Sequence, residues 1–294
     1  MPTVTEFENE PLLKKSSDRL VVFPIKYPDL WKMYKDMEAS IWKAEEIKAS
    51  QDLNDWNNKL NDNERHFVKN VLAFFSSSDG IVMENLVANT MKLIQVSEAR
   101  QAYATQLFVE AVHSETYSML IDTYVKDKEE QFRLFNAIDT IPAVAKKANW
   151  AMKWIGDEDP TKPNGTSFVE MLVAFAIVEG VFFSGSFCSI FWLKSRGLMT
   201  QGLAVSNEFI SRDEGMHCDL AVLLYKKYIV GKLSDSRIHE IVKEAVEIEK
   251  EFITESLPCR LIGMNSDLMK EYIEYVADRI VSQLGHKKIY GSKN

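Results

Sequence analysis

Residues 168–193 form an almost wholly apolar stretch, and few folds can accommodate one. Its length would suit a membrane-spanning helix. Glu170 and Glu179 lie within it, however, and a carboxylate without a partner in lipid costs several kcal/mol. It is also the only such stretch that we identify, and it lacks asymmetric basic flanks. Because a helix that is apolar on every side is otherwise the central helix of a large bundle, we expect a helical bundle and no membrane association.

Glu179 gives the first indication of a function. A lone charge inside a protein core is prohibitively costly, so this carboxylate needs a compensating partner. A metal ion is the natural partner for a carboxylate in such a place. The apolar stretch therefore predicts both the fold and the kind of site that the fold would hold.

The rest of the chain also follows a helical period, and only 12 glycines and 8 prolines interrupt its 294 residues. We find no strand-like alternation and no repeat of fixed length, so the predicted fold class is all-α. Asn61 or Asp62 would cap the second long helix. Residues 156–165, rich in proline, glycine and turn formers, are the clearest loop. Helices are expected over 30–49, from 62 past 81, and over 97–125, 127–137, 140–155, 168–193, 208–228, 234–257 and 266–284.

Charge and cysteine content exclude several classes of protein. The sequence has 35 basic and 43 acidic side chains, a net charge of −8, and its nearest basic cluster is only the pair Lys287 and Lys288. A nucleic-acid surface needs a longer basic stripe, so we expect no nucleic-acid partner. The three cysteines form no CxxC pair, which leaves neither a zinc site nor a thiol redox motif. A sparse, odd cysteine count and a polar start without a signal core indicate a cytoplasmic protein.

Two Glu-x-x-His elements carry the chemistry: Glu110 with His113, and Glu214 with His217. Residues three apart share a helix face, so each carboxylate and imidazole can reach the same ion. Two such elements, plus one carboxylate from each of two other helices, are the ligand set of di-metal bundles. Oxygen and imidazole donors suit iron or manganese better than metals that seek thiolates. Because about half a match is expected by chance in this composition, the pair alone is only suggestive.

The surroundings of these elements strengthen the interpretation. Tyr117 lies seven residues after Glu110 and on the same helix face, while Glu179 and Asp79 supply carboxylates from two other apolar segments. A phenol can hold a one-electron hole, and an apolar cage would protect that hole from water and reductants. By contrast, the other histidines have no glutamate three residues before them, and we expect them at the surface: His66, His239 and His286.

Four motifs closely resemble the radical-generating small subunit of class I ribonucleotide reductase, and the similarity is strongest to the eukaryotic type. It extends from about Pro24 to Tyr290, with the motifs in the order found in that family. They are Phe-Phe-x-x-Ser-Asp-Gly-Ile at 74–81, Glu110-x-x-His113-Ser-Glu-x-Tyr117, Val178-Glu179-Gly-x-Phe-Phe-Ser-Gly-Ser186 and Ser211-Arg-Asp-Glu214-Gly-x-His217-Cys218. The resemblance implies a ferritin-like helical bundle with extra helices, which forms a homodimer and works with a large catalytic subunit.

The resemblance also implies a role for each matched residue. Asp79, Glu110 and His113 would bind a first iron, and Glu179, Glu214 and His217 a second, with Glu110 and Glu214 bridging. Tyr117 would be oxidised by oxygen at this centre to a stable radical. Phe183, Phe187 and Ile210 match the apolar pocket around that tyrosine. Trp42 and Asp213 match the start of the route by which electrons and protons reach the large subunit.

The sequence has no thiol pair to reduce a ribose and no glycine-rich loop to cradle a phosphate. We therefore expect ribonucleotides to bind and be reduced to deoxyribonucleotides on the partner. Relatives of this kind continue into a tail that docks on the large subunit and carries a further tyrosine, which Tyr290 does not match. We divide the chain into a tail (1–23), a di-iron bundle domain (24–290) and the start of a missing C-terminal tail (291–294), and we expect weak docking. The 156–165 loop looks longer than is usual in the family and has no assigned role.

Three alternatives stay open at this point. A different di-iron oxidase of the desaturase or hydroxylase type could use the same bundle, although it would need neither Tyr117 nor the pair of Trp42 and Asp213. An iron-storage cage would be built from a chain near half this length. A silent partner with a structural site is the third alternative, and two irons or an iron–manganese pair could fill the same ligands.

Overall fold

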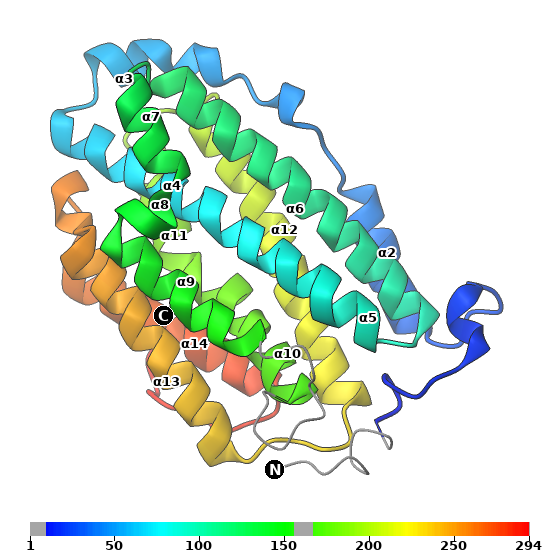
Figure 1. The fold of residues 1–294 in the computed structure, drawn as a ribbon. Coiled ribbons are helices and arrows are strands. Elements are labelled where there is room, and N and C mark those ends of the chain that lie inside the picture. The colour runs from blue at the N-terminus through cyan, green and yellow to red at the C-terminus, as the bar shows by residue number, and fades with distance from the viewer. Residues whose placement is uncertain (1–9, 156–166, 294) are drawn as a thin grey trace.

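The structure is a computed structural model that describes residues 10–155 and 167–293. Every regular element in these two ranges is helical, which confirms the predicted all-α class. In Figure 1 the long helices α6 (Ser97–Tyr124) and α4 (Asp62–Asn85) run side by side, with α2 (Pro28–Ala39) against the other side of α6. The predicted loop at 156–165 lies outside the described residues.

The second half of the bundle is built around the apolar stretch. Helix α10 (Phe168–Ile177) packs against α12 (Leu203–Leu223), and α12 also contacts α6. Helices α13 (Asp235–Glu251) and α14 (Ser266–Gln283) pack together on the side of the bundle away from α2 (Figure 1). The core therefore lies between α4, α6, α10 and α12.

The apolar stretch is one continuous helical run, as its composition predicts, but its hydrogen-bonding pattern changes along it. After α10 the chain makes one π-helical turn, η5 (Val178–Phe182), passes through Phe183, and begins α11 (Ser184–Ser195). By length and composition, Asp62–Leu93 and Phe168–Ser195 could both cross a membrane, although we identified only the second from the sequence. Of their most apolar windows, however, 61% and 89% are buried inside the fold, so they are core helices here.

The predicted helix over 30–49 is wrong beyond Ala39. Helix α2 ends there, and Lys43 is extended, with φ −125° and ψ 148°. Short turns then follow at Ala44–Glu46 and Ala49–Asp52, before α3 (Leu53–Asn58). The extended segment contains Trp42, which is buried, so the chain leaves the helix where that side chain enters the core.

Other boundaries differ from prediction by less. Asn61 caps α4, and its side chain and that of Glu64 accept each other's backbone amide at 2.9 Å. The predicted 127–155 region divides into α7 (Lys128–Phe135), α8 (Ala137–Thr140) and α9 (Pro142–Ile155). Several helices end in π-helical turns or are joined by short elements: Ser17–Leu20, Leu86–Thr90, α5 (Met91–Leu93), Leu224–Tyr228, Phe252–Ser256 and Cys259–Ile262.

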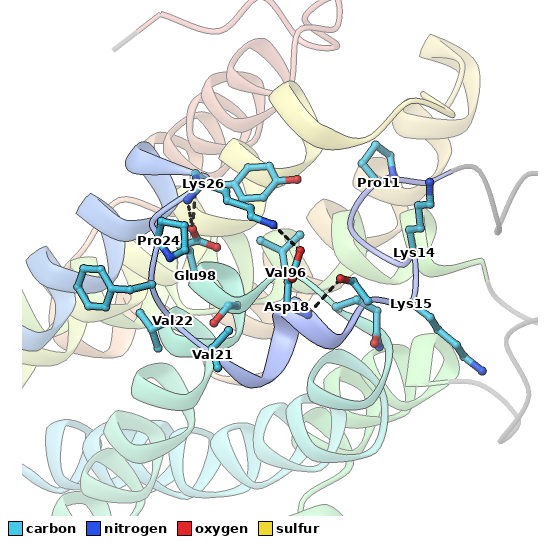
Figure 2. A pocket seen from close by; sticks show the side chains of 15 residues that line it. Pro11, Lys14, Lys15, Asp18, Val21, Val22, Pro24, Lys26, Val96 and Glu98 are labelled. Carbon is cyan, nitrogen blue, oxygen red and sulfur yellow. Dashed lines mark hydrogen bonds and ion pairs between the residues drawn. The ribbon is translucent and has the colours of Figure 1, made fainter.

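The described part of the N-terminal segment packs on the bundle. Leu12 is fully buried, and its carbonyl accepts a hydrogen bond from the Gln95 amide at 2.7 Å. The Glu10 carboxylate accepts from the amides of Val230 and Gly231. This segment and the start of α6 enclose a surface pocket of about 450 Å³, shown in Figure 2. None of the sequence-predicted site residues lines that pocket.

Candidate metal centre

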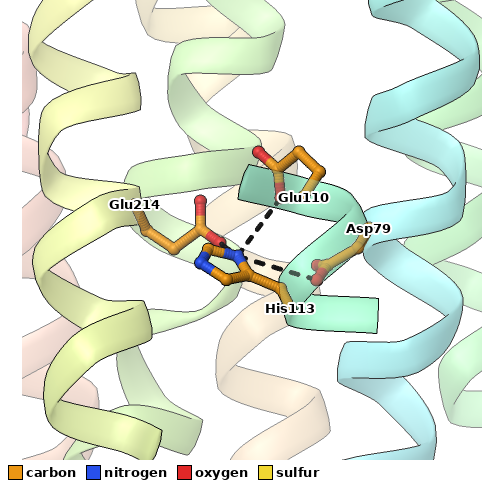
Figure 3. A group of neighbouring side chains, drawn as sticks. All are labelled: Asp79, Glu110, His113 and Glu214. Atoms are coloured by element: carbon orange, nitrogen blue, oxygen red, sulfur yellow. Dashed lines mark ion pairs between the residues drawn. The ribbon is translucent and has the colours of Figure 1, made fainter. Parts of the chain in front are cut away.

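The six residues predicted as metal ligands come together from four helical segments. Asp79 lies on α4, Glu110 and His113 on α6, Glu179 on η5, and Glu214 and His217 on α12, and each side chain is at least 95% buried. They form two overlapping groups, each with ligand atoms within 4.8 Å of one another: Asp79, Glu110, His113 and Glu214, and then Glu110, Glu179, Glu214 and His217. Figure 3 shows the first group, whose side chains point toward one another from α4, α6 and α12.

Glu110 and Glu214 belong to both groups, and each has one carboxylate oxygen near His113 and the other near His217. His113 Nδ1 lies 3.4 Å from Glu110 Oε2 and 3.0 Å from Glu214 Oε1. His217 Nδ1 lies 2.9 Å from Glu110 Oε1 and 3.1 Å from Glu214 Oε2. Asp79 Oδ2 is 3.9 Å from His113 Nδ1 and so completes the first group. Each shared carboxylate therefore faces both sides of the centre, which is the arrangement of a bridging ligand.

The electrostatics of this cluster favour bound cations. Four carboxylates and two imidazoles are packed in a buried space. Six of their atoms make no well-directed hydrogen bond among the described residues, although some lie within 3.0–3.4 Å of one another: Asp79 Oδ1 and Oδ2, Glu110 Oε2, His113 Nδ1, Glu179 Oε2 and Glu214 Oε1. Orphaned buried polar atoms are costly, and metal coordination would satisfy all of them. The donor set of oxygens and imidazole nitrogens fits two divalent ions of the iron or manganese type.

The pKa values follow from the same crowding. Burial, together with the charges of Glu110 and Glu214, raises the pKa of Asp79 and of Glu179 well above the usual carboxyl range. Burial alone would lower the pKa of His217, but Glu110 and Glu214 outweigh it and raise the value to about 9. Without metal, the centre therefore retains protons that bound ions would displace.

Tyr117 lies in a sealed aromatic pocket beside the cluster. Its side chain is 2% exposed, and its hydroxyl has no hydrogen-bond partner among the described residues. The ring centroid of Phe75 lies 4.9 Å from that of Tyr117, and Phe75 in turn contacts Phe183 at 5.5 Å and Phe187 at 5.2 Å. Ile210 is buried on α12. Burial and the nearby carboxylates, Asp79 first, raise the pKa of Tyr117 well above its usual value, so the phenol keeps its proton.

Trp42 and Asp213 meet beside the cluster. The indole Nε1 of Trp42 donates to Asp213 Oδ2 at 2.7 Å, and the same oxygen lies 3.1 Å from His113 Nε2. The rings of Trp42 and His113 are stacked, 5.9 Å apart. Arg212 donates to the other Asp213 oxygen at 2.9 and 3.1 Å and so fixes this carboxylate. The predicted pair is therefore joined to a predicted metal ligand.

Two residues at the site were missed by the sequence analysis. Phe75 makes the direct ring contact with Tyr117, although only its neighbours in the fold were assigned to the pocket. Gln106 donates from Nε2 to Glu179 Oε1 at 2.9 Å and to Glu110 Oε1 at 3.2 Å. Its position four residues before Glu110, on the same helix face, is the signal that could have revealed it. The histidines that we expected at the surface are not in either ligand group: His66, His239 and His286.

Comparisons with known proteins agree with this geometry. The family model described as ribonucleotide reductase, small chain, matches residues 19–294. A ribonucleoside-diphosphate reductase small subunit of Arabidopsis thaliana is 58% identical over 294 residues, which cover 100% of this chain and 85% of the relative. The small subunit of Dictyostelium discoideum is 60% identical over 285 residues, 97% of this chain and 82% of the relative.

Solved structures show the same fold. The ribonucleotide reductase Rnr4 homodimer of Saccharomyces cerevisiae superposes with a TM-score of 0.87 at 38% identity, covering 98% of this chain and 88% of the other. The R2 subunit from Clostridium botulinum has a TM-score of 0.82 at 22% identity over 92% of this chain and 86% of the other. These matches confirm the ferritin-like helical bundle that the resemblance implied.

Proposed function

This chain belongs to the ribonucleotide reductase small-chain family, in its eukaryotic class I form, and from that premise we propose that it stores an oxidising equivalent on Tyr117. Its enzymatic role is that of the small subunit of a ribonucleoside-diphosphate reductase, and this favours the reductase over a desaturase or hydroxylase. The buried cluster would hold a dinuclear metal centre.

We assign two iron ions to this centre, with an iron–manganese pair as the second choice, because the ligands combine four carboxylates with two imidazoles. Asp79, Glu110 and His113 would hold one ion, and Glu179, Glu214 and His217 the other. The observation that supports a dinuclear centre is that Glu110 and Glu214 each have one oxygen near His113 and the other near His217. Bound iron would supply the oxygen-dependent removal of one electron from a neighbouring group.

The protein's own residues determine where that electron comes from. Tyr117 would give one electron and its phenolic proton to the centre, because its hydroxyl has no other hydrogen-bond partner among the described residues. Phe75, Phe183 and Phe187 exclude water and reductants from the oxidised ring. Asp213 and Trp42 then offer a hydrogen-bonded route from the cluster at His113 toward a partner.

The partner of this proposal is a large catalytic subunit. Cys188, Cys218 and Cys259 are all free thiols, and none is placed at the metal centre. Ribonucleotide reduction needs an accessible thiol pair, and Cys218 and Cys259 are buried, so we place substrate binding and reduction on that partner. We also propose a homodimer, because the yeast relative is described as one, and a cytoplasmic location. The proposed domain division is an N-terminal tail (1–23) and the bundle (24–290), followed by residues 291–294.

Electron paramagnetic resonance tests the central assignment. Ferrous iron and oxygen added to the metal-free protein are expected to give a tyrosyl signal that Tyr117→Phe abolishes while iron binding persists. Tyr103→Phe is the matched control, because Tyr103 is also buried on α6 and close enough to Glu179 for that charge to raise its pKa. A wild-type protein that binds two irons per chain without any tyrosyl signal would contradict the proposal. It would favour instead a di-iron oxidase of the desaturase or hydroxylase type.

A further inference from the structure

Lys147 on α9 and Glu249 on α13 form an ion pair in the interior of the bundle. Their side chains are 1% and 0% exposed, respectively. The Lys147 ammonium also lies 3.8 Å from the ring centroids of both Phe74 and Phe252. A fully buried lysine is rare, and apolar residues of similar volume often serve stability as well as a buried ion pair does. The pair therefore calls for an explanation other than stability.

Both members of the pair bind the backbone where the α-helical hydrogen-bonding pattern of the apolar stretch is interrupted. We call this interruption, between η5 and α11, the break at Phe183. Lys147 Nζ donates to the Phe182 carbonyl at 2.7 Å, at the last residue of η5. Glu249 Oε1 accepts from the Gly185 amide at 3.1 Å, in the first turn of α11. Thus one polar side chain binds each side of the break at Phe183. Glycine at 185 leaves room for this approach, since a Cβ there would lie 2.6 Å from Glu249 Oε1 and Glu249 would have to shift.

The break connects the two parts of the candidate site. Glu179 lies within η5, three residues before the carbonyl that Lys147 binds. Phe183 and Phe187, which belong to the Tyr117 pocket, lie at and just after the break. Lys147 also contacts Phe74, and the ring centroid of Phe74 is 5.5 Å from that of Phe183 in the Tyr117 pocket.

We propose that Lys147 and Glu249 are a positioning pair for the metal centre, which fixes the break at Phe183 and thereby the direction of Glu179. This inference rests on the proposed function in one respect, because it takes Glu179 to be a metal ligand. The pair acts through directed hydrogen bonds to Phe182 and Gly185, which an apolar pair of the same volume would not make. Groups that orient a ligand typically change metal affinity 10- to 100-fold when they are removed.

Cobalt(II) binding tests the positioning role without any radical chemistry. The variants are Lys147→Met, Glu249→Met and the two combined; each removes a charge and its hydrogen bond to the backbone while keeping a similar side-chain volume. We expect Co(II) affinity at one of the two sites to fall about 10-fold, with a changed visible absorption spectrum. Lys146→Met is the matched control, since Lys146 and Glu251 join the same two helices by an ion pair at the surface. It should leave affinity and spectrum unchanged.

Wild-type Co(II) affinity and spectrum in folded variants, with only the melting temperature altered, would overturn the proposal and leave a structural pair. If Lys147→Met does not fold, the combined variant decides the question, because it removes both hydrogen bonds without leaving a buried charge unpaired. Co(II) loading requires neither oxygen nor Tyr117. A missing tyrosyl signal in the wild type would therefore contradict the proposed function alone, whereas unchanged Co(II) binding in the variants would contradict this inference alone.

Discussion

The indole nitrogen of Trp42 donates a hydrogen bond of 2.7 Å to the carboxylate of Asp213, a residue 171 positions away in the chain. The contact exists because the chain leaves α2 at Ala39 and brings Trp42 into the core in an extended segment. The same Asp213 oxygen lies 3.1 Å from His113 Nε2, so one carboxylate joins the indole to a candidate metal ligand. This relationship makes Trp42 testable independently of the metal centre.

Trp42→Phe is expected to bind metal normally and to lose turnover with a large subunit by about 100-fold or more, because misplacing one group in a reacting array has effects of that size. Phenylalanine keeps an aromatic ring but cannot donate to Asp213. Metal content and ribonucleotide reduction are the two measurements. Trp56→Phe is the control, since Trp56 is equally buried but stacks on Tyr124. Full turnover by Trp42→Phe would show that Trp42 is not part of the transfer route to the large subunit.

Tyr117→Phe is expected to stabilise the metal-free protein by about 1 kcal/mol, because the buried hydroxyl has no partner among the described residues and such groups are costly. Tyr124→Phe should do the reverse and lower the free energy of unfolding by about 1–3 kcal/mol. The Tyr124 hydroxyl donates to Asp52 Oδ2 at 2.9 Å, so removing the hydroxyl deprives the buried Asp52 carboxylate of one hydrogen bond. Urea unfolding of both variants checks the prediction. A destabilised Tyr117→Phe would mean that the hydroxyl has a partner in solution.

The sequence predicted which carboxylates lie together better than it predicted the backbone that presents them. A carboxylate in an apolar stretch and two Glu-x-x-His elements are local signals, and they selected Glu179, Glu110 and Glu214, which the fold brings together. The break at Phe183 has no such signal, because its partners, Lys147 and Glu249, come from helices distant in the chain.

Two other differences, at Ala39 and at Gln106, have separate causes. Helix α2 ends at Ala39 because the Trp42 side chain enters the core and donates to Asp213. A hydrophobic period within the segment cannot predict a contact with a residue so distant in the chain. Gln106 was missed for the opposite reason. Its spacing of four residues from Glu110 places it on the same helix face. However, a glutamine amide is not a usual ligand for these metals, so the sequence did not mark Gln106 as part of the site.

Gln106→Leu is expected to weaken metal binding about 10-fold, because the amide orients two ligands by donating to Glu179 and Glu110. The fold should persist, since leucine has a similar volume and the position is buried. Affinity is measured by competition with a chelator, and Gln101→Leu at a partly exposed position of the same helix is the control. Equal affinities in the two variants would show that Gln106 has no orienting role.

The metal-free protein is expected to lose stability as the pH rises from about 6.5 to about 9. The pKa of His217 is raised from 6.5 in the unfolded chain to about 9 in the fold, so its stabilising contribution is complete below 6.5 and is lost toward 9. Raised pKa values at Asp79 and Glu179 act in the same direction. Neighbouring histidines hold the pKa of Glu214 below its usual value, so its contribution is lost only as the pH falls below 4.5.

Bound metal should reverse that trend, because the ions require these groups to be deprotonated and affinity then rises with pH. Thermal unfolding of metal-free and Mn(II)-loaded protein across this range gives the two slopes. Calorimetry in buffers of different ionisation enthalpy would count the protons released on binding. Parallel slopes for the two forms would contradict the assignment of these groups as ligands.

Gly185→Ala is expected to lower the free energy of unfolding by about 1–3 kcal/mol, the usual cost of overpacking a core. Its Cβ would meet Glu249 Oε1 at 2.6 Å and Ile253 at 3.1 Å. Gly215→Ala on α12 is the control, since no atom lies within 4 Å of its Cβ, and there a helical glycine replaced by alanine should gain about 0.5–1 kcal/mol. Urea unfolding of the metal-free proteins gives both values.

The double variant Gly185→Ala/Glu249→Ala then separates the two contacts at Gly185. If Glu249 is the main obstacle, shortening it removes most of the cost of the added methyl group, and the double-mutant cycle shows a coupling energy above about 0.5 kcal/mol. Additive effects would instead assign the close packing to Ile253. Coupling between these two positions would establish that the approach of α13 to the break, and not general crowding, is what requires a glycine at 185.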